Sequence, residues 1–168
     1  RNGEKTDLIV LGDGVETEKY LALSTLLVKE LGAKHRVVFR PHPMERGHML
    51  QLSGGKASDV IIEWDKGIYE AFETAEIVVS ELSTGLFEAV GLVVRIFRWD
   101  TPKAVFYSPA HPFAVFSDAD DLVAKIRDGE SGRVDTLTVE DLWAPNWKEN
   151  YLAFLESVCP GIVDCSVP

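Results

Sequence analysis

Short apolar runs alternate with stretches of helical periodicity from the N-terminus to about residue 97. The runs fall at residues 7–11, 36–39, 60–62, 77–79 and 94–97, and each is followed by a polar residue or a glycine. Such runs predict buried strands. Between the first two, Tyr20, Leu23, Leu27 and Leu31 share one face of a helix that begins near Thr17 and ends before Gly32. We expect shorter helices at 44–52, 68–74 and 84–90.

The pattern loosens after residue 97, where prolines punctuate a stretch that we expect to be rich in loops. Asp118 then predicts the cap of a helix that continues to Arg127. Asn146 and Glu149 form a capping-box pattern that would open a last helix. No internal repeat or low-complexity segment interrupts the chain.

Strands that alternate with helices predict an α/β fold. We expect a Rossmann-like, mostly parallel open sheet with right-handed crossovers and helices on both faces. The organisation that follows is a single domain over residues 1–168, with a core at 6–130 and a helical extension at 131–168.

Composition narrows the possible partners. The chain has 168 residues and a net charge of −10, which disfavours nucleic acid but leaves room for a small phosphorylated ligand in a local cationic pocket. We see no stretch long enough to cross a membrane and no leader peptide. Cys159 and Cys165 lack zinc-site spacing, so we expect free thiols in a cytoplasmic protein, with a disulfide in the tail as the alternative.

Two motifs follow predicted strands and carry the chemistry. The first is Arg40-Pro41-His42-Pro43, in which two prolines restrict the backbone of a histidine that could donate to a phosphate oxygen. Arg40 could add a positive charge. Ordinary alternatives are a loop histidine whose prolines only end the strand, and an Arg40 salt bridge. A metal pair of His42 with His48 is disfavoured, because no carboxylate partner stands at helical spacing.

The second motif is the turn Ser83-Thr84-Gly85, which would open a helix. Hydroxyls and free N–H groups at a helix N-terminus can hold an anion, although simple capping explains the same residues. Glu88, one turn further, could accept hydrogen bonds from a ribose, or be a solvated carboxylate. Gly12, in the turn after the first strand, could bring backbone close to a ligand; that turn is too short for a dinucleotide fingerprint.

The order of these elements and motifs over residues 6–130 resembles the C-terminal, nucleotide-binding half of a GT-B glycosyltransferase. The His-Pro pair and the Ser/Thr turn are most similar to bacterial sialyltransferases, polysialyltransferases, capsule enzymes and teichoic-acid glycerophosphate transferases, which use cytidine nucleotide donors. The stretch from Ser83 to Glu88 is also similar to a turn of the UDP-N-acetylglucosamine 2-epimerases.

The resemblance implies a function and a site. The chain would bind a nucleotide-sugar or CDP-linked donor, with His42 as the catalytic residue on the donor phosphate, Ser83 and Thr84 on phosphate, and Glu88 on the ribose. It implies no cofactor and no metal. The alternatives are a UDP-sugar 2-epimerase and a non-catalytic interaction or ligand-sensing domain.

The resemblance also implies a second domain. The chain begins at Arg1 rather than Met and lacks the N-terminal Rossmann-like half of such enzymes. We therefore expect a piece of a longer protein whose own N-terminal domain completes the site. The isolated chain should bind nucleotide weakly and should not turn over.

Overall fold

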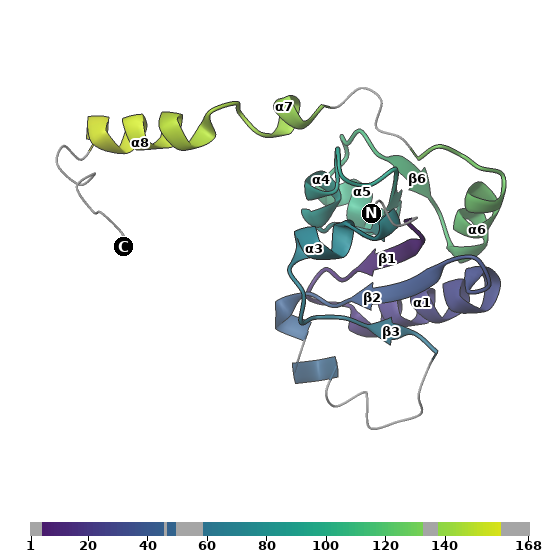
Figure 1. Ribbon diagram of the computed structural model, residues 1–168. Coiled ribbons are helices and arrows are strands. Elements are labelled where there is room, and N and C mark those ends of the chain that lie inside the picture. Colours follow the sequence, from purple (N-terminus) through teal and green to yellow (C-terminus); the bar gives the residue numbers. More distant parts are fainter. Residues whose placement is uncertain (1–4, 46, 50–58, 133–137, 159–168) are drawn as a thin grey trace. The chain divides into compact units, whose positions relative to one another are not determined.

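The computed structural model describes residues 5–45, 47–49, 59–132 and 138–158. Its centre is a sheet of six strands in the order β3-β2-β1-β4-β5-β6 (Figure 1). The strands are β1 (Asp7–Leu11), β2 (Arg36–Arg40), β3 (Ile61–Ile62), β4 (Ala75–Ser80), β5 (Arg95–Trp99) and β6 (Ala114–Phe116). Each neighbouring pair is parallel. This confirms the predicted Rossmann-like α/β fold.

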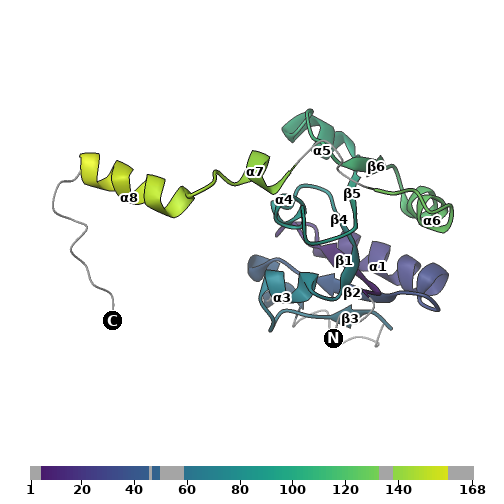
Figure 2. The same ribbon diagram turned by 45° about the horizontal axis from the view of Figure 1, so that its top comes forward.

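Helices cover both faces of this sheet. Helices α1 (Thr17–Leu31) and α6 (Ala119–Arg127) contact each other on one face, and α3 (Ile68–Phe72) and α4 (Gly85–Glu88) lie on the other (Figure 2). Every residue of β1 is buried, as the continuous apolar run predicts for a strand between two helical layers. Tyr20 of α1 is fully buried on the sheet and stacks on Phe39, with ring centroids 6.4 Å apart.

The stretch expected to be loops contains two further elements, so the prediction of five strands is wrong by one. Helix α5 (Pro102–Tyr107) begins with Thr101 as its cap, whose side chain accepts from the Ala104 N–H at 3.1 Å. Proline is well tolerated in the first turn of a helix, so Pro102 opens α5 rather than breaking it. Strand β6 is only three residues long and therefore gives a weak sequence pattern.

Two predicted helices are shorter than expected. Helix α4 covers Gly85–Glu88 instead of residues 84–90, with Thr84 as its cap residue. In the 44–52 region, a 3-10 turn covers Pro43–Glu45 and residues 47–49 are helical. Residues 50–58, and both cysteines, lie outside the described part of the chain.

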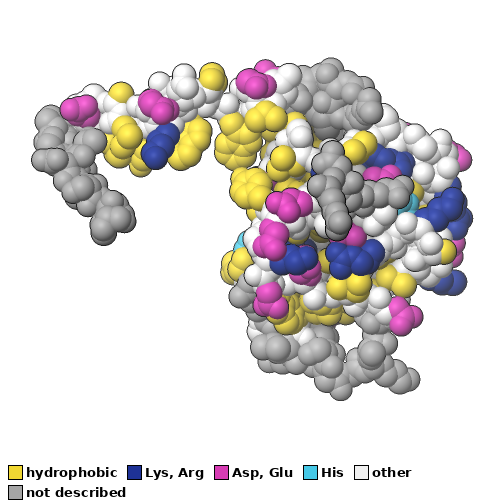
Figure 3. Space-filling model, viewed as in Figure 1, with side chains coloured by type: hydrophobic (Ala, Val, Ile, Leu, Met, Phe, Trp, Pro, Cys, Tyr) yellow, Lys and Arg dark blue, Asp and Glu magenta, His cyan; other side chains and the backbone are white. Residues whose placement is uncertain are grey.

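The chain divides into two compact units after Thr136. The second unit contains α7 (Val139–Leu142) and α8 (Trp147–Val158). The capping box in this unit joins Thr138 and Asp141; Asn146 instead has a φ of 56°, outside the extended region that a capping residue uses. Hydrophobic side chains of α8 are exposed (Figure 3). Within the described residues, no helix has the length and apolar character needed to cross a membrane.

Candidate functional site at the carboxyl edge of the sheet

The two central strands, β1 and β4, are neighbours from which the chain departs in opposite directions. After β1 it continues to β2 on one side, and after β4 it continues to β5 on the other. The strand ends are tied together, because the Ser80 hydroxyl donates to the Leu11 carbonyl at 2.8 Å. In open α/β sheets, ligands bind in the crevice outside the carboxyl ends of the strands at this switch point. The topology therefore locates the candidate site before any side chain is considered.

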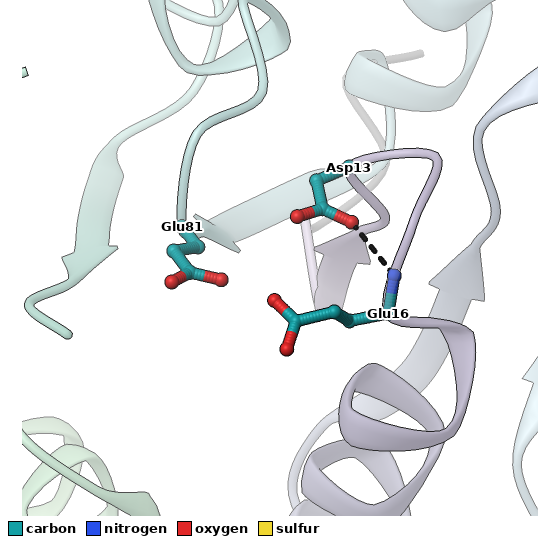
Figure 4. Close-up of side chains that lie close together, drawn as sticks. All are labelled: Asp13, Glu16 and Glu81. Carbon is teal, nitrogen blue, oxygen red and sulfur yellow. Dashed lines mark hydrogen bonds between the residues drawn. The ribbon is translucent and has the colours of Figure 1, made fainter. Parts of the chain in front are cut away.

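Three carboxylates from the two loops at this switch point face one another (Figure 4). Asp13 follows β1, Glu16 precedes α1, and Glu81 follows β4. Asp13 also closes the loop, because its Oδ1 accepts from the N–H groups of Val15 and Glu16 at 3.0 and 3.1 Å. These two bonds fix the entry of α1, where the N-cap residue Glu16 makes no side-chain cap bond of its own.

Two lysines neutralise this acidic cluster. The Lys103 ammonium lies 2.6 Å from Asp13, contacts Glu16, and lies 3.6 Å from Glu81. Lys19 is 2.7 Å from the fully buried Glu81 carboxylate, which also accepts from Thr101. Although the three carboxylates are close enough together to hold a cation, an ammonium group already bonds to them. The arrangement is an ion-pair network that connects α5 to the β1 and β4 loops.

The pKa directions agree with this network. Burial alone would raise the pKa of Asp13, but the bonds from Lys103 and from two backbone N–H groups outweigh it and lower that pKa. Burial would lower the pKa of Lys103, and the hydrogen bonds to Asp13 and Glu16 raise it instead. The hydrogen bond from Lys103 also lowers the pKa of Glu16. All three groups are therefore charged at neutral pH.

The Arg40–Pro43 turn is held against the β1 loop by a residue that the sequence analysis missed. Glu45 is 2% exposed, and its carboxylate accepts from the His42 N–H at 2.6 Å and from the Thr17 hydroxyl at 2.8 Å. Gly12 packs directly on it: a Cβ at position 12 would lie 2.2 Å from Glu45 Oε2. Gly12 is therefore required by a buried carboxylate, which is a different reason from the predicted approach to a ligand.

His42 lies on the exposed side of the same turn, beside the β1 loop. Its Nδ1 accepts from the Met44 N–H at 3.2 Å, so a neutral ring carries its proton on Nε2. Gly14, with a φ of 91°, leaves room for this ring; a Cβ there would lie 3.1 Å from His42 Nδ1. The backbone and one ring nitrogen of His42 are thus fixed by the protein, while the residue itself is exposed.

Arg40 ends β2, and its Nη2 donates to the Lys66 carbonyl. Its guanidinium therefore reaches toward the loop after β3, on the side of β2 away from β1. Arg40 therefore holds a neighbouring loop, and its predicted role as a positive charge beside His42 stays a prediction.

The Ser83–Gly85 turn lies on the other side of the β1 end. A Cβ at Gly85 would lie 2.7 Å from Leu11 Cδ1 and 3.2 Å from Ser83 Oγ, so this turn packs closely on the end of β1. The Ser83 hydroxyl accepts from the Gly85 N–H at 3.2 Å, while Thr84 is exposed. Because α4 has only four residues, its dipole contributes less than the sequence analysis assumed.

Glu88 lies at the end of α4, beside the Tyr69 hydroxyl of α3. Desolvation, the negative charge of Glu88 and a hydrogen bond to it together raise the pKa of Tyr69. A ribose that bound Glu88 would therefore share this carboxylate with a tyrosine.

The structure thus brings both predicted motifs to one edge of the sheet, on either side of β1. Ser83 also lines a small pocket of about 50 Å³, partly open to solvent, to which the Arg40–Pro43 turn does not contribute. Sequence reasoning missed Glu45, Glu81 and Lys103. Glu81 could have been found, because it follows a buried strand directly; Lys103 could not, because α5 was not predicted.

The fold is similar to parts of three solved structures. The chain aligns over 92% of its length with a structure of the wall teichoic acid polymerase TagF, at 18% identity and a TM-score of 0.51. It aligns equally far with the GtfA/B complex, at 10% identity and a TM-score of 0.52. A match to the beta Kdo 2,4 transferase KpsC of Thermosulfurimonas dismutans covers 56% of the chain with a TM-score of 0.39. No protein-family model and no curated sequence matches.

These similarities show the fold. A six-stranded, parallel, Rossmann-like sheet of this kind is like one half of a GT-B glycosyltransferase. The chain spans 39% of the polymerase and 36% of the GtfA/B chain, so it corresponds to part of each.

Proposed function

We propose that this chain is the donor-binding half of a GT-B glycosyltransferase that builds a bacterial surface polysaccharide. The observation that carries the proposal is the position of the two motifs. His42 and the Ser83–Gly85 turn lie on either side of the end of β1, at the switch point of a Rossmann-like sheet. Ligands of such sheets bind at this point.

In the proposed mechanism, an acceptor displaces a nucleotide phosphate at the anomeric carbon of the donor sugar. The exposed His42 Nε2–H donates to the leaving phosphate, where negative charge develops in the transition state. Ser83 and Thr84 supply hydroxyl and N–H donors to the same phosphate, and Glu88 accepts from the ribose. In an enzyme of this architecture, the other half would supply the acceptor site.

Binding measurements on the present chain test this proposal. We expect CMP or CDP to bind with a dissociation constant near millimolar, or roughly 4 kcal/mol, because the chain corresponds to only part of the solved structures that it resembles. His42→Ala should abolish measurable binding, whereas His48→Ala should not. His48 is a suited control, since it is exposed and its ring pairs with Glu18 at 3.3 Å.

The alternatives predict other results. A preference for UDP over the cytidine nucleotides would favour a UDP-sugar 2-epimerase. No detectable binding of CMP, CDP or UDP at several millimolar would favour a non-catalytic domain.

A further inference from the structure

We propose that Arg98 forms the centre of a binding site for a small oxyanion, a carboxylate or a phosphate group, in the pocket next to Ser83. Arg98 lies on β5 and is 2% exposed, yet it lines this pocket. Its Nη1 donates to the Ser108 carbonyl at 2.6 Å. In the described part of the chain, Nε and Nη2 have no hydrogen-bond partner.

A buried guanidinium with two unused donors is unusual, because buried polar groups are nearly always hydrogen-bonded. The charge is only partly balanced: Asp100 Oδ1 lies 3.7 Å from Nη2, beyond hydrogen-bonding distance, and its side chain is 37% exposed. Nε and Nη2 are also the two atoms that form one edge of the guanidinium fork. This edge binds carboxylate or phosphate through two parallel hydrogen bonds.

The other polar residues of the pocket supply further donors. His111 Nδ1 accepts from the Phe113 N–H at 3.2 Å, so in the neutral ring Nε2 carries the proton and can donate. The imidazole is held in place by stacking on Phe113, at 6.1 Å between ring centroids. The Ser83 Oγ accepts from Gly85, which leaves its own proton to donate.

The rest of the pocket suits an anion that carries a small apolar body. Its other walls are the side chains of Leu82, Leu86, Phe87 and Phe113. Glu81 also lines it, but both oxygens of that carboxylate accept from other groups, and Lys19 and Lys103 balance its charge. A chain of net charge −10 repels anions in general, so binding here would require this local set of donors.

The site stands independently of the nucleotide proposal, because His42 does not contribute to it. An assignment of the bound anion to the nucleotide donor rests, in addition, on the proposed function. The pocket shares Ser83 with the proposed donor site, so the anion would belong to the donor.

Anion titration at constant ionic strength tests the site directly. The Arg98 Nε–H resonance is followed by NMR as chloride is replaced by inorganic phosphate or by acetate. We expect a saturable shift with at least one of them, and the stronger of the two identifies the group that the pocket prefers. No shift with either at tens of millimolar would overturn the proposal.

Variants separate the site from nonspecific charge effects. Phosphate or acetate that binds the folded chain should raise its melting temperature. Arg98→Gln should remove this rise, whereas Arg127→Gln should keep it. Arg127 is matched because it is exposed, carries the same charge and pairs with Glu30 instead. His111→Gln guards against misfolding of the Arg98 variant and should weaken phosphate or acetate binding by roughly tenfold. Equal responses of wild type, Arg98→Gln and His111→Gln would contradict the assignment.

The same titrations distinguish this inference from the proposed function. If phosphate shifts the Arg98 Nε–H resonance but CMP, CDP and UDP do not bind, the anion site is supported and the donor-binding proposal is wrong. Nucleotide binding that depends on His42, without any response of Arg98, would do the opposite.

Discussion

Replacing Glu45 should both destabilise the fold and loosen the His42 turn. Glu45 does not line the pocket and is 2% exposed, but it is the group that joins the His42 backbone to α1. Its two hydrogen bonds, at 2.6 and 2.8 Å, are made by a carboxylate inside the protein. Hydrogen bonds to charged groups contribute about 1.5–3 kcal/mol each.

Glu45→Ala removes both bonds, and the freed His42 N–H can turn to water because His42 is exposed. We therefore expect a loss near the lower end of the sum, about 3 kcal/mol of the free energy of unfolding. Glu45→Gln keeps one acceptor oxygen but presents an amide NH₂ to the other donor, so its loss should be about half as large.

Urea unfolding followed by tryptophan fluorescence measures both variants, and an unchanged slope validates the comparison. Glu70→Ala is the matched control: it removes the same charge from an exposed position of α3, and should cost less than about 0.5 kcal/mol. The reasoning is refuted if Glu45→Ala costs no more than Glu70→Ala. Under conditions where each variant is folded, Glu45→Ala should also weaken CDP binding, since His42 loses its backbone anchor.

Three further predictions concern packing, pH and catalysis. Gly85→Ala should destabilise by about 1–3 kcal/mol, since the new Cβ meets side chains on the β1 end, whereas Gly47→Ala, with open space around it, should be neutral or slightly stabilising in thermal unfolding. Burial would raise the pKa of Asp7, but the hydrogen bonds from Arg36 and Thr74 and the charge of Arg36 outweigh it and lower that pKa. Asp7 therefore stabilises the fold at pH values above its unfolded pKa of about 4, and this stabilisation is lost as the pH falls through its lower folded pKa, so Asp7→Asn should flatten the acid side of the curve of unfolding free energy against pH. If wild type and Asp7→Asn lost the same free energy of unfolding on acidification, this reasoning would be wrong. In the full-length protein, His42→Ala should lower the transfer rate by roughly two to three orders of magnitude and stability by less than about 1 kcal/mol, and a fully active, strongly destabilised variant would make His42 structural.

The central strands were predictable because a strand buried between two helical layers is a continuous run of apolar residues. The run at 7–11 is apolar after Asp7 and matches β1 residue for residue, and the 17–31 periodicity matches α1. The elements at the β5–β6 edge of the sheet have weaker sequence patterns. β6 is apolar throughout, but a run of three residues is too short to predict a strand, and Pro102 at the start of α5 resembles a loop residue.

The sequence predicted the location of the candidate site better than the residues that form it. Residues directly after buried parallel strands meet at one edge, so His42 and Ser83 could be assigned to it from sequence. The residues that hold the site together come from elsewhere in the chain. Lys103 lies 90 positions from its partner Asp13, and such long-range ion pairs have no periodicity to reveal them. Arg98 was hidden for another reason, since a charged residue within a strand pattern indicates exposure more often than burial.

Titration of the ¹⁵N-labelled chain with CDP, followed by amide NMR spectra, tests the central claim most directly. The account predicts saturable shifts at His42, at Ser83 to Gly85 and at the Gly12–Gly14 loop, with few changes at the N-terminal ends of the strands. Shifts confined to other surfaces, or none at several millimolar CDP, would contradict the proposal that this edge of the sheet binds a nucleotide donor.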